Sequence, residues 1–210
     1  MLVLTANTLV DNQPSDMIEA VLRLVSRELN GYLDSKYRRQ GNGTELVMPG
    51  NVHQDGTVAF EEENKIIASV INIERDTTRR TFNYRSTDDG SRSSYARPAF
   101  NLNVYMLFSA YFNTDNYLKG LDYLSGILRY FQENGLFIPP SDTSLAEEGV
   151  QKLSFELVNL NLQEMSNLWG AMGAKYIPSV IIKTRLITID EATVHESIPV
   201  ISGADTETES

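Results

Sequence analysis

The sequence predicts an α+β fold in which a mixed or mainly antiparallel β-sheet is flanked by about three helices. Three segments have apolar side chains at the three- and four-residue spacing of amphipathic helices. Between them lie segments whose apolar residues alternate or are mostly β-branched, as is typical of strands. The chain has 210 residues, 41% of them hydrophobic, which is enough for a single core. We therefore expect one domain at residues 1–190.

The first predicted helix follows Asp16, a residue type that often caps helices, and covers residues 17–33. Its apolar face is formed by Ile18, Val21, Leu22, Val25, Leu29, Tyr32 and Leu33. The dipeptide Asn30-Gly31 is expected to weaken the end of this helix. Short strands are predicted at residues 46–48 and 57–60, and a buried strand rich in β-branched residues at 66–73.

Residues 100–112 have the clearest strand pattern, because apolar and polar side chains alternate along much of the segment. Asn113 is positioned to cap the helix that follows. In that helix the apolar residues recur at helical spacing over residues 117–131, and Gly135 marks its end.

The last third of the chain predicts a strand, a short helix and a final strand. Residues 153–158 form the first of these strands, and residues 180–189 form the second. Asn161 and Glu164 have the spacing of a capping box that opens the helix between them. Trp169, the only tryptophan, is expected to pack this helix against the sheet, and anchoring a partner protein is the alternative.

Two segments differ from the rest of the chain in charge. Residues 75–97 contain six arginines and three acids, a local charge of +3 in a chain whose net charge is −10. We expect residues 77–97 to form a projecting basic loop, either solvated or docked on an acidic protein surface or on nucleic acid. The candidate partner-binding residues in this loop are Arg79, Arg80, Arg85 and Arg92. Residues 191–210, rich in acids, are expected to form a flexible tail.

The composition excludes most catalytic chemistry. The chain has no cysteine and only two histidines, His53 and His195, so thiolate sites and histidine metal cages are not expected. It also lacks a Gly-rich phosphate loop and a serine nucleophile elbow. We therefore predict no catalytic, cofactor-binding or metal-binding residue. The acidic balance argues against nucleic acid as a partner, and we expect neither a signal peptide nor a bilayer-spanning stretch.

Two segments resemble one known protein family. Residues 97–111 contain proline, then Asn-Leu, then Tyr-x-Leu and a final Ala-Tyr. Residues 157–179 contain Leu-Trp followed by small residues, Gly173 and Tyr176. Both segments are similar to the cap, or tail-terminator, proteins of phage-tail-like contractile injection systems, of the Photorhabdus virulence cassette and antifeeding prophage type. The resemblance extends over residues 15–190.

This resemblance implies an assembly protein without catalysis. Six copies would form a ring on the distal end of the inner tube and sheath, end polymerisation and hold the sheath extended. The implied partners are further copies of the chain and the tube and sheath proteins, without a cofactor, nucleic acid or membrane insertion. Assembly would take place in the cytoplasm, within a particle that can be released. The alternatives are a tail completion protein, a baseplate adaptor or a nucleic-acid accessory protein.

Overall fold

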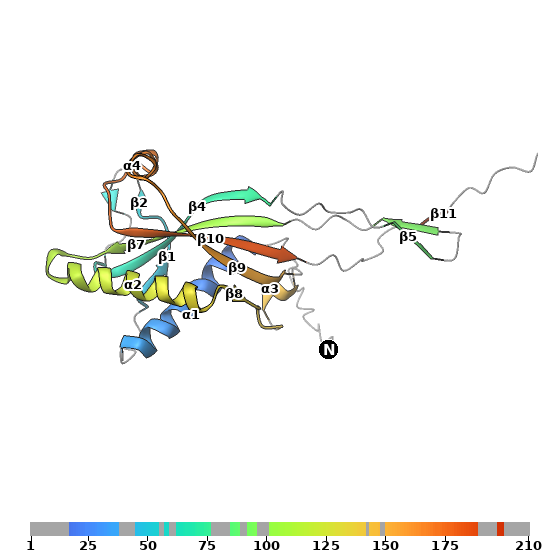
Figure 1. The fold of residues 1–210 in the computed structure, drawn as a ribbon, viewed down its shortest axis with the longest axis horizontal. Helices are drawn as coiled ribbons and strands as arrows, with labels where there is room; N and C mark the ends of the chain where they lie inside the picture. Colours follow the sequence, from blue (N-terminus) through green and yellow to red (C-terminus); the bar gives the residue numbers. More distant parts are fainter. Residues whose placement is uncertain are drawn as a thin grey trace, which may run out of the picture.

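A six-stranded mixed sheet with helices on both faces organises the chain (Figure 1). The computed structural model describes residues 17–37, 45–54, 57–58, 62–76, 85–88, 92–95, 101–141, 143–147, 150–188 and 197–199. In their order across the sheet, the strands are β1 (Val47–Pro49), β4 (Lys65–Arg75), β7 (Leu102–Tyr111), β10 (Ser179–Thr188), β9 (Val150–Val158) and β8 (Leu136–Phe137). Strand β1 runs parallel to β4, and the other neighbours are antiparallel. The predicted α+β class is therefore confirmed.

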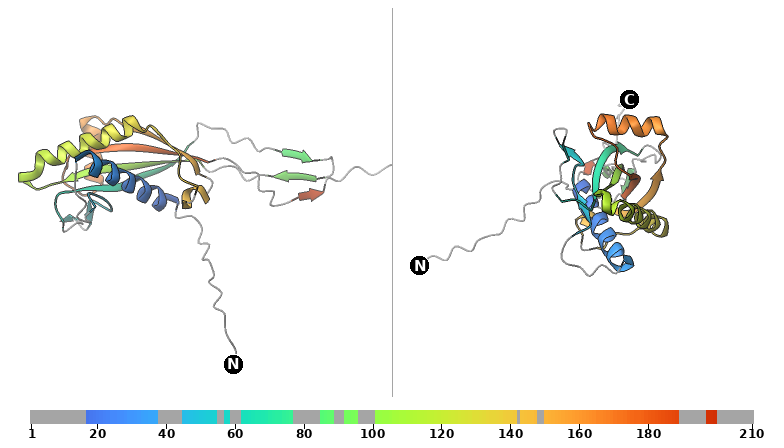
Figure 2. Two further views of the ribbon diagram at one scale, coloured as in Figure 1. Left: turned by 90° about the horizontal axis from the view of Figure 1, so that it is seen from below. Right: turned by 90° about the vertical axis from the view of Figure 1, so that its left-hand side faces the viewer.

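The helices divide unequally between the two faces of the sheet. They are α1 (Met17–Tyr37), the 3-10 turn η1 (Thr114–Asn116), α2 (Tyr117–Glu133), α3 (Ser144–Glu147) and α4 (Leu162–Ala171). Helices α1 and α2 lie side by side across one face (Figure 2, left), and α4 lies across the other. A small hairpin of β2 (His53–Gln54) and β3 (Thr57–Val58) lies near the α4 face.

The larger core lies between the sheet and helices α1 and α2. Phe131 of α2 packs against Phe108 of β7 and Phe155 of β9, with ring centroids 5.6 and 4.9 Å apart. The apolar positions predicted for residues 17–33 contribute Val21, Val25, Leu29 and Leu33 to this core. Burial of these side chains supplies the main force that holds the helices on the sheet.

Helix α1 extends to Tyr37, four residues beyond the predicted range, and Asn30-Gly31 lies within it. The Asn30 side chain accepts hydrogen bonds from the backbone amides of Leu46 and Val47 and donates to the Val47 carbonyl. This polar residue is thus bound to strand β1 instead of competing for the helix backbone. The extra turn is held by Tyr37, whose hydroxyl donates to the Asp122 carbonyl at 2.8 Å.

A second sheet contains strands from both charged segments. Its order is β11 (Ser197–Pro199), β6 (Arg92–Tyr95) and β5 (Arg85–Asp88), and both pairings are antiparallel. The same order is found for β10, β7 and β4, to which these strands are joined along the chain. Figure 1 draws the second sheet beyond the end of β4. The sequence predicted a projecting loop here, with a solvated hairpin tip as one interpretation, and a flexible tail, and it did not predict the pairing of β11 with this hairpin.

Candidate interaction surface around helix α4

Helix α4 begins and ends at well-defined caps. The Asn161 side chain accepts from the Glu164 amide and the Glu164 carboxylate accepts from the Asn161 amide, both at 2.9 Å, which confirms the predicted capping box. At the other end, the Ala174 amide donates to the Trp169 carbonyl and the Gly173 amide to that of Gly170. Gly173 has φ +63°, the left-handed conformation that this type of helix end requires. Residues at its two ends therefore determine where α4 begins and where it ends.

Trp169 holds α4 against the sheet. Its side chain is only 3% exposed and belongs to a cluster with Val52, Ile67, Leu107 and Ile181. The ring also meets Tyr176 edge to face. These contacts confirm the predicted packing of Trp169 between helix and sheet, and its role in binding a partner stays a prediction.

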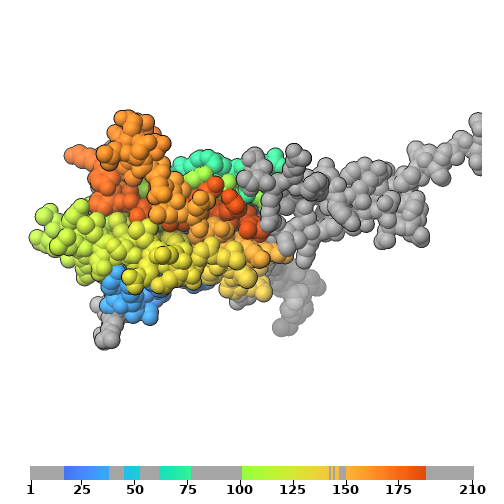
Figure 3. All heavy atoms as spheres, in the orientation of Figure 1, coloured from blue at the N-terminus to red at the C-terminus, as the bar shows by residue number. Residues whose placement is uncertain are grey.

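A groove follows the outer side of α4, and we call it the α4 groove. It has a volume of about 640 Å³ and is lined by Leu160, Asn161, Leu162, Met165, Ser166, Trp169, Gly170, Ala174 and Tyr176. Leu162 is 92% exposed and Tyr176 is 62% exposed. Figure 3 shows α4, in orange, projecting from the surface above the strands on which it packs. Large exposed apolar side chains beside a hollow are typical of a surface that binds another protein.

Sequence reasoning did not single out Leu162 or Tyr176. Leu162 lies three residues before Met165, so its spacing is that of a core position, and only the structure places it on the surface. Tyr176 follows the turn after α4 and is part of the motif that resembles the cap family. Its position in that motif, just after a helix predicted to end at Gly173, was the signal in the sequence that could have indicated a functional role for Tyr176.

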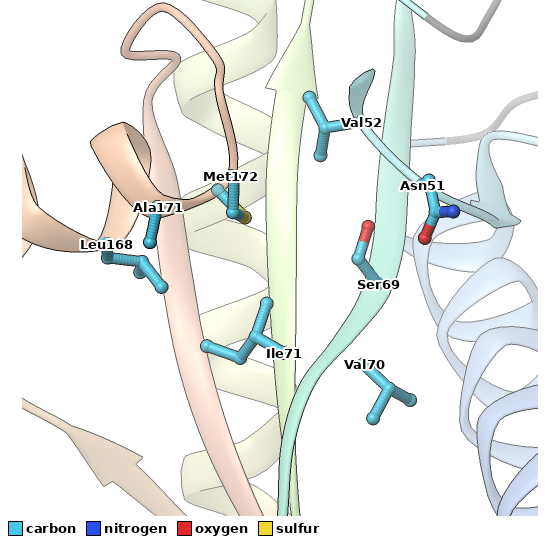
Figure 4. Close-up of a pocket in the computed structure, with 8 residues that line it drawn as sticks. All are labelled: Asn51, Val52, Ser69, Val70, Ile71, Leu168, Ala171 and Met172. Atoms are coloured by element: carbon cyan, nitrogen blue, oxygen red, sulfur yellow. The ribbon is translucent and has the colours of Figure 1, made fainter. Parts of the chain in front are cut away.

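A second hollow lies between α4 and strand β4. It measures about 360 Å³, and its walls include Leu168 and Met172 of α4 and Ile71 of β4. Figure 4 shows these three side chains around the space between helix and strand, with Val52 and Ser69 at its other end. Strand β1 pairs only with residues 66–68 of β4. Within the described residues, no strand pairs with the outer edge of β4 beyond that point, so this apolar hollow lies beside an open edge.

The same face of the sheet carries polar side chains farther along β4, β7 and β10. The Tyr105 hydroxyl donates to the Glu74 carboxylate at 2.9 Å, and the Lys183 ammonium lies 5.8 Å from the centre of the Tyr105 ring. Burial, and then the hydrogen bond and charge of Glu74, raise the pKa of Tyr105. Next to them, Arg185 pairs with the buried Asp76 at 3.2 Å. The charged side chains in this part of the face therefore interact with neighbouring side chains of the same chain.

The arginines predicted to bind a partner are only partly described. Arg79 and Arg80 lie outside the described residues. Arg85 begins β5 and Arg92 begins β6, and the two strands pair from Arg85 opposite Tyr95 to Asp88 opposite Arg92. The structure thus places Arg85 and Arg92 at opposite ends of one hairpin.

Within the described ranges, no group of three or more His, Cys, Asp or Glu side chains is placed to hold a metal ion. Among the helices of those ranges, none is long and apolar enough to cross a bilayer.

Comparison with known proteins places the chain in a family. A family model described as the Pvc16 N-terminal domain matches residues 18–203. The chain belongs to the Pvc16 N-terminal domain family. The match runs from the start of α1 through β11 and so includes the α4 groove and the second sheet of this Pvc16-type domain. Among curated proteins, none matches the chain.

Two solved structures are similar to this Pvc16-type domain. One is described as the sheath/tube terminator, in the extended state, of a PVC extracellular contractile injection system. It is 15% identical to this chain with a TM-score of 0.49, and the match covers 88% of this chain and 63% of that one. The other is described as the tube-terminating cap of the anti-feeding prophage: it is 17% identical with a TM-score of 0.48, covering 86% and 61%. The chain thus spans less than two thirds of either protein.

Proposed function

We propose that this chain is the cap, or terminator, of a contractile injection system. It closes the distal end of the inner tube and sheath, ends their polymerisation and holds the sheath extended. The single observation that carries the proposal is membership of the Pvc16 N-terminal domain family over residues 18–203. The cap-like motifs of residues 97–111 and 157–179 lie within that match.

The physical requirement on such a protein is asymmetry. A tube grows because each subunit binds the next through head-to-tail contacts that do not close on themselves. A terminator must reproduce one side of that contact and lack the other. The outer edge of β4, with which no strand of the described residues pairs beyond residue 68, is suited, together with the apolar hollow beside it, to receiving a strand from a tube or sheath subunit. The second sheet, at the far end of β4, offers a separate contact.

The partners follow from this role. The cap binds other copies of itself in a ring, expected to be hexameric, together with tube and sheath proteins. Its action is structural, without catalysis, nucleic-acid binding or membrane insertion, and it takes place on particles that are assembled in the cytoplasm. The acidic net charge of −10 supports protein partners over nucleic acid.

Particle length is the decisive measurement. In cells that produce the whole system without this chain, we expect tubes and sheaths of unregulated length or unstable, contracted sheaths. Restoring the chain should restore a uniform length, and a label on it should be seen by electron microscopy at the end opposite the baseplate. Particles of normal length without the chain, or a label at the baseplate end, would contradict the proposal and favour a baseplate adaptor.

A further inference from the structure

A second exposed apolar surface lies on helix α2, and we call it the α2 ridge. It consists of the exposed Tyr117, Leu118 and Leu128, of which Leu118 is 78% exposed and Tyr117 is 48% exposed. The half-buried Leu121 lies beside them and packs against the core. The helix buries its other side, which includes Tyr123, Ile127 and Phe131. The three exposed side chains contribute little to the core of their own chain, although a soluble helix normally exposes polar side chains on this flank.

The α2 ridge and the α4 groove cannot meet within one chain. Helix α2 covers one face of the sheet and α4 covers the other, as the right-hand view of Figure 2 shows. In Figure 1 the start of α2 and helix α4 both lie toward the end of the sheet away from β5 and β11. Two different surfaces of one chain that fit each other form a head-to-tail contact, and a repeated head-to-tail contact closes into a ring when its rotation permits.

The α4 groove is large enough to receive side chains of the α2 ridge. The groove, about 640 Å³ in volume, has room for several apolar side chains of an amphipathic helix. Gly170 forms part of its wall, and a Cβ atom added there would meet nothing within 4 Å. A glycine at this place lets the backbone of a second helix approach closely.

The charges at the ends of the two surfaces are complementary. The exposed Asp115 precedes the ridge and the exposed Arg129 follows it, roughly 21 Å apart at 1.5 Å per helical residue. The groove is bracketed by the exposed Glu164 in the first turn of α4 and by the exposed Lys175, four residues beyond the last residue of the helix. An antiparallel arrangement of α2 on α4 pairs Asp115 with Lys175 and Arg129 with Glu164.

From these observations we infer that the α2 ridge of one copy occupies the α4 groove of the next copy. The occupant of the groove is thus a second copy of this chain, and the repeated contact builds the ring. The inference rests on the proposed function only in that a cap ring needs such a contact. Asp115 and Arg129 set the antiparallel direction of the two helices, and the exposed Tyr117 and Leu118 supply the side chains that become buried.

The first test fills the groove without disturbing the fold. Gly170→Trp should reduce the native mass from that of the ring, about 142 kDa for six chains of 23.6 kDa, to that of a monomer. Gly31→Trp is the matched control, because Gly31 also lies within a helix, in α1, and its Cβ atom would also meet nothing within 4 Å. A circular dichroism spectrum and melting temperature shared by both variants would show that they are folded. A ring that persists in folded Gly170→Trp overturns the inference.

The second test uses the absence of cysteine from the sequence. Copies carrying Leu118→Cys and copies carrying Gly170→Cys are mixed under mild oxidation, and a disulfide-linked mixed dimer should form. Mixing Leu118→Cys with Gly31→Cys should give far less of it. Equal cross-linking of the two mixtures, or none with Gly170→Cys, overturns the inference even if particle length still depends on the chain. Loss of that dependence while the cross-link forms would instead reject the cap function and leave the contact between copies standing.

Discussion

The rings of Trp169 and Tyr176 meet edge to face, with centroids 5.8 Å apart and planes inclined at 72°. The two partners have very different surroundings, because Trp169 is 3% exposed and Tyr176 is 62% exposed. One ring fills the space between α4 and the sheet, and the other forms the outer wall of the α4 groove. The contact therefore joins a side chain that stabilises the fold to one that is available to a partner.

Substitution of these two residues should separate stability from assembly. Trp169→Ala is expected to lower the free energy of unfolding by about 3–5 kcal/mol, because it empties a buried aromatic site. Tyr176→Ala should cost only about 0.5–1.5 kcal/mol, the contribution of an aromatic pair, yet weaken ring formation. Urea unfolding measures the first effect and native mass the second. A melting temperature that Trp169→Ala leaves unchanged would contradict the placement of this ring in the core.

Two helical glycines should respond in opposite directions to alanine. A Cβ atom on Gly120 would lie 2.8 Å from Cδ2 and 2.9 Å from Cγ of Phe112. Cγ is the ring atom bonded to the Phe112 Cβ, so a rotation of the ring about that bond cannot relieve the contact. Gly120→Ala should therefore destabilise the fold by about 1–3 kcal/mol, since the overpacking outweighs the gain in helix propensity. Gly170→Ala, which meets no atom, should stabilise it by up to about 1 kcal/mol. Thermal unfolding of both variants is the measurement. Equal shifts in melting temperature would show that the Phe112 side chain moves to accommodate the added methyl group.

The elements with regular patterns were predictable from the sequence. Alternation over residues 100–112 predicted strand β7, and helical spacing over 117–131 predicted helix α2. Both patterns repeat with the period of the element itself, so they can be recognised within the segment. The capping box at Asn161 likewise located the start of α4, since its two hydrogen bonds depend on neighbouring residues alone. Local chemistry decided these cases.

Features that depend on distant parts of the chain were not predictable. The extra turn of α1 needs Asn30 bound to β1 and Tyr37 bound to α2, and neither contact is visible in the spacing of α1 itself. Strand β11 pairs with β6 more than a hundred residues earlier in the chain. The groove beside α4 was also missed, because Leu162 has the spacing of a core residue and yet is exposed. In each case a tertiary contact, or its absence, overrides the local pattern.

Alkaline pH should loosen the contact between α1 and α2. Burial, followed by the charge of Glu28, raises the pKa of Tyr130 to about 12, and burial with Asp122 raises the pKa of Tyr37 to about 12. Both lie above the ordinary value of 10, so the folded state binds more protons than the unfolded state between pH 10 and 12. Stability is therefore complete below pH 10 and falls as pH rises toward 12. Denaturant unfolding at several pH values should show this fall, and Tyr130→Phe should make it shallower.

A control for that experiment is Leu118→Ala, which changes an exposed side chain of α2 that has no titratable group. It should leave the slope of stability against pH as steep as in the unmodified chain. A slope that changes equally in both variants would show that the alkaline loss of stability does not arise at the interface of α1 and α2.

The basic segment that contains β5 and β6 should bind an acidic protein surface during assembly. Between residues 75 and 97 the sequence has a local charge of +3 in a chain of net charge −10, and protein partners of opposite charge are steered to such a site. Replacing Arg79, Arg80, Arg85 and Arg92 by serine should weaken binding to purified tube and sheath ends, most strongly at low salt. Co-sedimentation with particles at two salt concentrations measures this. Replacing the same residues by lysine should retain most of the binding, and an unchanged affinity in the serine variant would mean that these arginines are only solvated.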